Sequence, residues 1–426
     1  MRVLMVSANT ERINMPVLPV GMARVAAAAE QAGHDIRILN LMWSDQGVRE
    51  LPRVVNGFAP EAIGVSVRNI DDQNQENPHF LLPPVKEVVD ECRRLSSAPV
   101  ILGGPGYSIF PHAVLAYLGA DYGIQGEGEK AFPELLRSLE SRSSIAEIPG
   151  LILPQMHSGP PPQSIRELDD CPLPQPGVHL QVPRQEDSEQ FWVPFQTRRG
   201  CPMECSYCST PGIEGRIMRR HSTEAAIKGL KAFRAAEYKR FFFVDNIFNL
   251  PPSYAERLCE GIVAAGLDIS WQAIVYPSRL SQSLAKKMAR AGCTGVSLGF
   301  ESGSPRILAA MNKRFSPAEV RSVSDLLGEY DIFRMGFLLL GGPGETRSSV
   351  EESVSFVESL CLESVKLTPG IRIYPNTPLA RQAREEGIIH PEADLLHPAF
   401  YLQPKLDGWL QERVAELIEQ KPEWQI

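Results

Sequence analysis

The sequence predicts an α/β protein in which a Rossmann-like, doubly wound parallel sheet is followed by a partial (β/α)6 barrel. Short apolar runs alternate with helical segments along most of the chain, and one proline-rich stretch interrupts that alternation. The chain has 426 residues, which is about two to three times the length of an ordinary domain. These observations predict four segments: a first folded unit at 1–145, a linker at 146–190, the barrel at 191–380 and a short C-terminal cap at 381–426.

The first unit contains short apolar runs of the length expected for buried strands. They are Arg2–Ser7, Ile36–Leu41, Ala62–Val67, Val100–Leu102 and Tyr122–Gln125. The helical segments between and after them are Val20–Gly33, Val48–Phe58, Pro84–Leu95, Ala113–Leu118 and Ala131–Leu139. Such alternation predicts a parallel sheet with its ligand bound beyond the carboxyl ends of the strands, where the loops are rich in glycine and polar residues.

The alternation is lost over residues 150–190, where prolines stand among acidic and polar residues as in a linker. It resumes at Phe191 and continues to about Pro375. The predicted strands there are Trp192–Gln196, Phe241–Val244, Ile269–Ala273, Gly295–Phe300, Met335–Leu340 and Ser364–Ile373. About six βα units are too few for a closed (β/α)8 barrel and fit an open, partial one. An amphipathic helix is expected in the tail at Gly408–Glu419.

The composition is that of an ordinary globular protein, with 43% hydrophobic and 22% charged residues. A net charge of −8 gives no indication of nucleic-acid binding. We expect no transmembrane segment, because no apolar run reaches about 18 residues. The N-terminal residues turn polar too early for a signal-peptide core. These features together predict a cytoplasmic protein.

Three of the eight cysteines form a C-x3-C-x2-C triplet directly after a predicted strand: Cys201, Cys205 and Cys208. Three thiolates on one loop can bind three irons of a [4Fe–4S] cubane and leave the fourth iron open for another ligand. A structural zinc site would need a fourth ligand, for which His221 is the candidate, and no second C-x2-C is present. The isolated cysteines are expected to be small buried apolar residues: Cys92, Cys171, Cys259, Cys293 and Cys361.

The triplet, with Tyr207 before its third cysteine and a partial barrel after it, resembles the radical S-adenosylmethionine (SAM) superfamily. Other segments resemble the subgroup with an N-terminal cobalamin-binding domain, the class B radical SAM methyltransferases, and occur in the same order. They are Gly103-Gly104, Gly126–Glu129, Leu168–Pro174, Phe243–Asn246, Gly299–Ser304 with Met311–Lys313, and Leu340–Thr346. The resemblance covers residues 1–380 approximately.

This resemblance implies which residues contact SAM. The implied contacts are Tyr207, Asp245, Asn246, Glu301, Ser302, Gly341 and Gly342. Each also has a purely structural interpretation. The glycines would equally serve a strand-to-helix turn, Ser302 could cap a helix, and Tyr207 could pack against the cysteine loop.

The resemblance also implies a cobalamin site in the first unit. Its candidate residues are Ser66, Arg68, Asn69, Gly103, Gly104, Gly126 and Glu127. The loop Ser7–Pro19 carries no Asp-x-His-x-x-Gly motif, so we expect no histidine ligand to cobalt from it. An ordinary polar connection is the alternative interpretation of the loop around Arg68.

Resemblance therefore implies an enzyme with three cofactors: a [4Fe–4S] cluster, SAM and cobalamin. One SAM would supply a 5′-deoxyadenosyl radical that takes hydrogen from the substrate. Methylcobalamin, recharged by a second SAM, would then methylate an unactivated carbon of a small-molecule, lipid or peptide substrate. An electron donor such as flavodoxin or ferredoxin is the expected partner, and no acid or base catalyst is predicted.

Two other functions stay open. One is a radical SAM cyclisation, rearrangement or coupling enzyme whose N-terminal domain carries no methyl group or has lost cobalamin. The other is a non-catalytic iron–sulfur electron carrier. A basic cluster after the triplet, Arg216, Arg219, Arg220 and His221, is either a solvated charged face or a site for an anionic substrate.

Overall fold

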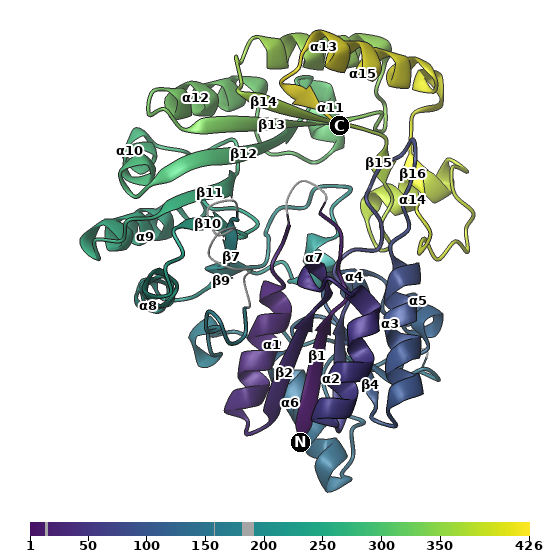
Figure 1. Cartoon of the computed structure of the whole chain (residues 1–426). Helices are drawn as coiled ribbons and strands as arrows, with labels where there is room; N and C mark the ends of the chain where they lie inside the picture. Colours follow the sequence, from purple (N-terminus) through teal and green to yellow (C-terminus); the bar gives the residue numbers. More distant parts are fainter. Residues whose placement is uncertain (13–15, 157, 181–190) are drawn as a thin grey trace. The chain divides into compact units, whose positions relative to one another are not determined.

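The computed structural model describes residues 1–12, 16–156, 158–180 and 191–426. The chain divides into two compact units. Unit 1 comprises the described residues of Met1–Asp72, His79–Phe191 and Gly212–Gly215, and unit 2 comprises Gln73–Pro78, Trp192–Pro211 and Arg216–Ile426. Figure 1 shows both along the chain.

Unit 1 is built on a six-stranded sheet of order β2-β1-β3-β4-β5-β6. Its strands are β1 Arg2–Ser7, β2 Asp35–Asn40, β3 Ala62–Ser66, β4 Val100–Gly103, β5 Tyr122–Ile124 and β6 Leu151–Ile152. The first five are parallel, and β6 pairs antiparallel with β5. The chain turns back from β2 over β1 to β3, so the predicted doubly wound sheet is confirmed. The two-residue β6 lies in the predicted linker and is too short to give a periodic signal.

The helices of unit 1 cover both faces of its sheet (Figure 1). They are α1 Val20–Gln31, α2 Leu51–Phe58, α3 Leu82–Leu95, α4 Pro105–Ile109, α5 Pro111–Leu118 and α6 Gly128–Ser141. Helix α1 packs against α6, while α3 contacts α2 and α5. Between the sheet and the α1–α6 pair lies a buried apolar core that includes Val3, Met5, Ile101, Phe132 and Leu135. Continuous apolar strands are required because the sheet is buried on both faces.

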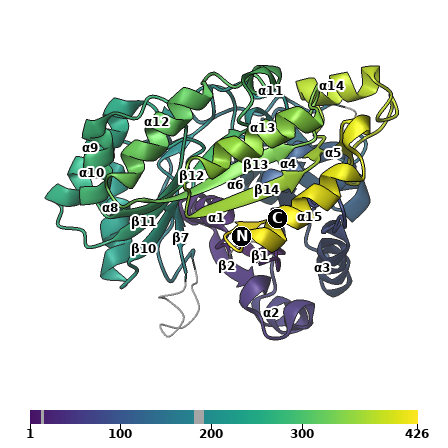
Figure 2. The same cartoon turned by 90° about the horizontal axis from the view of Figure 1, so that it is seen from above.

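Unit 2 is built on a seven-stranded parallel sheet of order β17-β14-β13-β12-β11-β10-β7. Its strands are β7 Val193–Phe195, β10 Arg240–Phe243, β11 Ser270–Val275, β12 Cys293–Glu301, β13 Phe333–Leu340, β14 Ser364–Pro369 and β17 Trp424–Gln425. Helices follow the strands along its outer side (Figure 2). They include α8 Thr223–Ala235, α9 Pro252–Ala264, α10 Gln282–Arg290, α12 Pro317–Gly328, α13 Arg347–Glu358 and α15 Trp409–Gln420. The consecutive order of β7 to β14 is that of the predicted partial barrel.

Two features of unit 2 differ from the sequence prediction. The predicted strand Ser364–Ile373 is divided at Gly370, where φ is +74° and an added Cβ would lie 2.7 Å from Gln75. After this turn, β15 Ile371–Arg372 pairs antiparallel with β16 Phe400–Tyr401. The predicted C-terminal cap also contributes β17, which pairs with β14 and adds a strand to the barrel sheet.

Candidate cluster and cofactor sites

The cysteine triplet lies on a loop that is tied to the barrel at both ends. The short strand β8, Arg198–Arg199, leads into the loop and pairs antiparallel with β9, Arg219–Arg220, which leads out of it. Within the loop, the Ser206 N–H donates to the Met311 carbonyl at 3.1 Å, and the Ser206 carbonyl accepts from the Leu379 N–H at 2.9 Å. The loop is therefore held by the segments that follow β12 and β14.

The three thiols are partly exposed and none forms a disulfide. Burial is the main cause that raises the pKa of Cys201 to about 11, and the thiolates of Cys208 and Cys205 contribute to that rise. Burial also raises the pKa of Cys205. The thiols are thus close enough to repel one another when ionised, which suits a cationic iron cluster that binds each thiolate through its own iron. In the described parts of the chain, no three His, Cys, Asp or Glu side chains surround one ion position, and a cubane does not require such a group.

A fully buried ion pair fixes the backbone just before the triplet. The Asp245 carboxylate accepts from the backbone N–H groups of Thr197 and Arg198, at 2.6 and 2.8 Å, and from the Thr197 hydroxyl at 2.5 Å. Arg198 Nε lies 3.2 Å from Asp245 Oδ2. The Arg198 guanidinium also donates to three carbonyls after β10 and lies over the rings of Phe248 and Tyr254.

These contacts change the interpretation of Asp245, which the sequence analysis placed against SAM. Both carboxylate oxygens already accept hydrogen bonds inside the protein, and the residue has no exposed surface. The geometry favours a positioning role, in which Asp245 orients Thr197 and Arg198 and thereby the loop that begins at Cys201. The neighbouring Asn246 is half-buried, and its contact with SAM stays a prediction.

Glu301 and Tyr207, predicted from separate motifs, are in direct contact. The Tyr207 hydroxyl donates to Glu301 Oε1 at 3.0 Å, and Lys313 Nζ donates to the same oxygen at 3.3 Å. Lys313 is buried, and although burial opposes its charge, the carboxylate of Glu301 and the thiolate of Cys205 raise its pKa. Glu301 also has a φ of +68°, which a non-glycine residue adopts at an energetic cost.

Lys313 belongs to the motif segment Met311–Lys313, but the sequence does not predict it as a site residue. A buried ammonium group between a carboxylate and a cluster cysteine could not be predicted from spacing, because α11, Pro305–Ala310, separates Lys313 from Glu301. The structure thus places Tyr207, Glu301, Lys313 and Cys205 in one polar group. The other carboxylate oxygen of Glu301, Oε2, accepts no hydrogen bond in the described structure.

The glycine loop after β13 is organised by Glu345, which the sequence analysis did not single out. Glu345 Oε2 accepts from the N–H groups of Gly341 and Gly342, at 2.5 and 3.1 Å, while Oε1 is buried without a hydrogen-bond partner. Burial raises the pKa of Glu345 to about 7. A Cβ at Gly341 would lie 2.5 Å from Leu402, and one at Gly342 would lie 2.9 Å from Ile371. Packing within the protein therefore already explains both glycines, and their contact with SAM stays a prediction.

Ser302 is fully buried, and its hydroxyl bonds to the Ser353 hydroxyl at 2.9 Å and accepts from the Ser304 N–H at 3.1 Å. These contacts join the end of β12 to α13 and favour the structural interpretation of Ser302.

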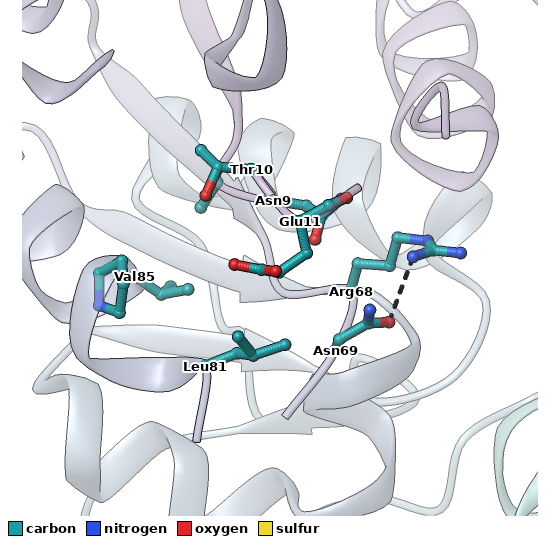
Figure 3. Close-up of a pocket in the computed structure, with 9 residues that line it drawn as sticks. Asn9, Thr10, Glu11, Arg68, Asn69, Leu81 and Val85 are labelled. Atoms are coloured by element: carbon teal, nitrogen blue, oxygen red, sulfur yellow. Dashed lines mark hydrogen bonds between the residues drawn. The ribbon is translucent and has the colours of Figure 1, made fainter. Parts of the chain in front are cut away.

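The cobalamin candidates lie at the carboxyl ends of the strands of unit 1. Arg68 and Asn69, after β3, line a small hollow with Asn9, Thr10 and Glu11 after β1 (Figure 3). Arg68 donates to Asn69 Oδ1 at 3.4 Å. Burial lowers the pKa of the Arg68 guanidinium. No carboxylate in the described structure forms an ion pair with Arg68. These side chains offer amide, hydroxyl and guanidinium groups, which can exchange hydrogen bonds with amides such as those around a corrin ring, and their contact with cobalamin stays a prediction.

The predicted glycines approach neighbouring backbone closely at the same edge. An added Cβ at Gly104, where φ is +102°, would lie 2.6 Å from the Val67 carbonyl and 3.2 Å from the Ser66 hydroxyl. The Gly126 N–H donates to the Ser108 hydroxyl at 3.0 Å, whereas an added Cβ at Gly103 would lie 4.0 Å from the Ile124 carbonyl, an ordinary contact. Glu127 Oε2 accepts from the Ile165 N–H at 2.8 Å, so this side chain holds the segment predicted as a linker. No histidine lines the hollow.

Two domain models match this chain. The B12-binding domain model matches residues 6–136, and the radical SAM superfamily model matches residues 195–357. An uncharacterized methyltransferase of Pyrococcus horikoshii is 26% identical over 95% of this chain and 94% of its own length. The tryptophan 2-C-methyltransferase of Streptomyces laurentii is 26% identical over 89% of this chain and 74% of its own length.

Solved structures show the same fold. The radical SAM methyltransferase TsrM from Kitasatospora setae, with cobalamin and a [4Fe–4S] cluster bound, has a TM-score of 0.87. It is 22% identical and covers 100% of this chain and 91% of its own. The cobalamin-dependent radical SAM enzyme OxsB has a TM-score of 0.80 at 16% identity and covers 98% of this chain and 67% of its own.

Fold, cysteine loop and domain matches together define a radical SAM enzyme with an N-terminal B12-binding domain. In sequence and fold the chain is similar to cobalamin-dependent radical SAM methyltransferases, and it carries both of the domains that these enzymes combine. The predicted fold class, enzyme class and set of three cofactors are thereby confirmed, while the residues that contact each cofactor and the segment boundaries stay predictions. Among the described residues, no helix is long and apolar enough to cross a membrane.

Proposed function

We propose that this protein methylates an unactivated carbon of a small-molecule substrate, with the cluster held by Cys201, Cys205 and Cys208. When bound, the cofactors supply a reducing centre, a source of the deoxyadenosyl radical and a carrier for the methyl group. The single observation that carries the proposal is the Tyr207–Glu301–Lys313 group beside Cys205, on a chain whose relatives are methyltransferases.

The residues of this group have distinct tasks in the proposal. Glu301 offers an oxygen to a hydroxyl or ammonium group of SAM, since its other oxygen is held by Tyr207 and Lys313. Lys313 donates to that carboxylate and balances the negative charge of the thiolates. Asp245 and Arg198 keep the loop in one conformation, so that the thiols are arranged before the metal binds.

The substrate class follows from the relatives in general terms only. Those with 26% identity or less include enzymes named for tryptophan and for cytidylyl-2-hydroxyethylphosphonate, both small polar molecules. A hopanoid methylase, which acts on a lipid, matches over 58% of this chain. The two matches that cover 89% and 96% of this chain therefore support a small polar substrate over a lipid.

The experiment uses anaerobically reconstituted protein, cobalamin, reductant and SAM labelled with ¹³C in its methyl group, incubated with a metabolite extract of the source cells. Mass spectrometry should find a labelled product that requires both cobalamin and the cluster. Replacement of Cys201, Cys205 and Cys208 with Ala should abolish the brown absorbance, SAM cleavage and the product. Replacement of the buried Cys259 with Ala is the matched control and should retain all three.

Two results would contradict the proposal. Cluster and SAM cleavage retained in the triple variant would refute the assignment of the cysteines. SAM cleavage without any transfer of labelled carbon would favour the cyclisation or rearrangement alternative.

A further inference from the structure

A pocket in unit 2 lies against the cysteine loop, and no step of the proposed function uses it. Its volume is about 430 Å³, and its wall includes Pro202 and Met203, which stand between the first two cysteines. The opposite wall comes from residues after β10 and β11, including Leu250 and Tyr276. The candidate SAM residues Glu301, at the end of β12, and Gly341, after β13, lie toward the other half of the sheet, whereas Asn246 follows β10 on the side of the pocket.

One side chain links this pocket to a cluster cysteine. Tyr276 is buried in the pocket wall, packs edge-on against Phe315 with ring centres 5.2 Å apart, and accepts a hydrogen bond from the Arg314 N–H at 3.3 Å. Burial raises the pKa of Tyr276, and the Cys205 thiolate contributes to that rise. Tyr276 therefore lies within electrostatic range of Cys205, and Pro202 in the pocket wall directly follows Cys201.

Exposed arginines from three separate segments surround the pocket: Arg220 after the loop, Arg279 after β11 and Arg314 after α11. Glu204 pairs with Arg314 at 2.9 Å and with Arg216 at 2.5 Å. Within the described ranges, Arg220 and Arg279 form no ion pair.

One further carboxylate is close enough to Arg279 to interact with it. It belongs to Glu319 and accepts hydrogen bonds from Ser278 and Ser316. The pocket rim and its neighbours thus carry four arginines, Arg216, Arg220, Arg279 and Arg314, and two glutamates, Glu204 and Glu319. This surface has a net positive charge, although the net charge of the chain is −8.

We propose that this arginine-rimmed pocket is the docking surface for a small, acidic one-electron carrier protein. The inference depends on the proposed function only in requiring a redox cluster on the loop. The carrier gives up one electron to the iron–sulfur centre, no proton moves and no covalent bond changes. A basic rim attracts an acidic partner from a distance and raises its association rate at low ionic strength. The competing occupant is a small anionic substrate. We would expect buried hydrogen-bond donors to bind the acid group of such a substrate, whereas these arginines are exposed.

The test compares two double charge reversals of equal size. Arg220→Glu with Arg279→Glu changes the rim. Lys286→Glu with Arg290→Glu changes exposed residues of α10 for which the described structure gives no polar partner, and serves as the control. Binding of oxidised flavodoxin to the reconstituted protein is measured by biolayer interferometry at low and high salt. Reduction of the cluster by photoreduced flavodoxin, and separately by reduced methyl viologen, is followed by electron paramagnetic resonance.

The rim variant should bind flavodoxin about 10- to 100-fold more weakly at low salt and lose most of the salt dependence. Its cluster should be reduced by methyl viologen as fast as in the wild type, and the control variant should behave as the wild type throughout. Unchanged flavodoxin affinity in the rim variant would overturn the proposal. So would normal flavodoxin reduction combined with loss of product formation, which would assign the pocket to an anionic substrate. Absence of a cluster in the wild type would instead contradict the proposed function.

Discussion

At the scale of single residues, Glu301 is where the sequence motif and the structure agree most closely. Its strained backbone and its contacts with Tyr207 and Lys313 hold one carboxylate oxygen in place and leave the other without a hydrogen bond in the described structure. Backbone strain is retained where the surrounding structure determines the conformation and is concentrated at functional sites.

We predict that Glu301→Ala weakens SAM binding about 10- to 100-fold, the value of one or two hydrogen bonds to a charged group. Iron content should not change, because the carboxylate is not needed to bind the cluster. Isothermal titration with SAM and iron analysis of the same reconstituted sample provide the measurements.

Ser302→Ala is the control, since the Ser302 hydroxyl is used inside the protein. It should bind SAM as the wild type does. Equal affinity of the two variants would return Glu301 to a purely structural role.

The raised pKa of Glu345 makes the stability of the folded protein depend on pH, and it also gives the sign of that dependence. Its pKa of about 7 in the folded protein exceeds the ordinary 4.5, so the unfolded chain ionises first. The contribution of Glu345 to stability is therefore fully present below pH 4.5 and is lost as the pH rises to about 7, by at most about 3 kcal/mol.

Glu345→Gln keeps this position neutral at every pH. The melting temperature of the variant relative to the wild type should therefore increase between pH 5 and pH 8. Glu352→Gln, an exposed change on α13, should show no such trend. A constant difference for Glu345→Gln across this range would show that its carboxyl group does not titrate there.

At the scale of elements, the strands and helices could be predicted closely because each strand is an apolar run bounded by turn residues. The sequence prediction missed the two-residue strands β6, β8, β9, β16 and β17, and it merged β14 with β15. Pairs this short are determined by the partner strand and not by local pattern. Gly370 was the available signal for the break, but glycine also occurs inside strands.

The candidate site was predictable where one motif places several ligands on one loop, as in the cysteine triplet. It was less predictable where a side chain can point either to a ligand or into the protein. Asp245 and Ser302 follow strands in the predicted positions, yet both side chains are bonded internally. Sequence spacing gives the position along the strand and leaves the direction of the side chain open.

The buried Asp245–Arg198 pair makes a prediction about the loop it supports. Asp245→Ala would leave a buried guanidinium without its partner and should cost about 3–5 kcal/mol. Cluster loading should fall in the same variant. Asp245→Asn keeps one acceptor for the N–H groups of Thr197 and Arg198 and should recover part of both losses.

Thermal unfolding of the metal-free protein and iron content after reconstitution provide the two readouts. Glu351→Ala, which breaks a more exposed pair with Arg413, should cost no more than about 1 kcal/mol and leave iron content intact. Normal stability of Asp245→Ala with weaker SAM binding would show that Asp245 contacts SAM after all.

At the scale of the whole molecule, the two units supply separate chemistry, and the B12-binding unit makes its own prediction. Cobalamin should bind with no histidine ligand to cobalt, because no histidine lines the hollow after β1 and β3. Electron paramagnetic resonance of the cob(II)alamin form should give a base-off spectrum without nitrogen hyperfine splitting. Splitting from a protein nitrogen would contradict this assignment, and failure to bind any corrinoid in a folded, cluster-bearing protein would contradict the methyl-transfer mechanism.

The units are not consecutive along the chain, and this has a consequence for dissecting the protein. Gln73–Pro78 belongs to unit 2, where Gln75 packs at the Gly370 turn and bonds to Gln411, while Gly212–Gly215 belongs to unit 1. A fragment that starts at residue 191 would therefore lack a piece of its own barrel, and one that stops at 190 would lack a piece of the B12-binding unit. Exchange of whole domains between relatives by recombination at the linker would meet the same obstacle. A single cut at the linker therefore does not separate the two units cleanly.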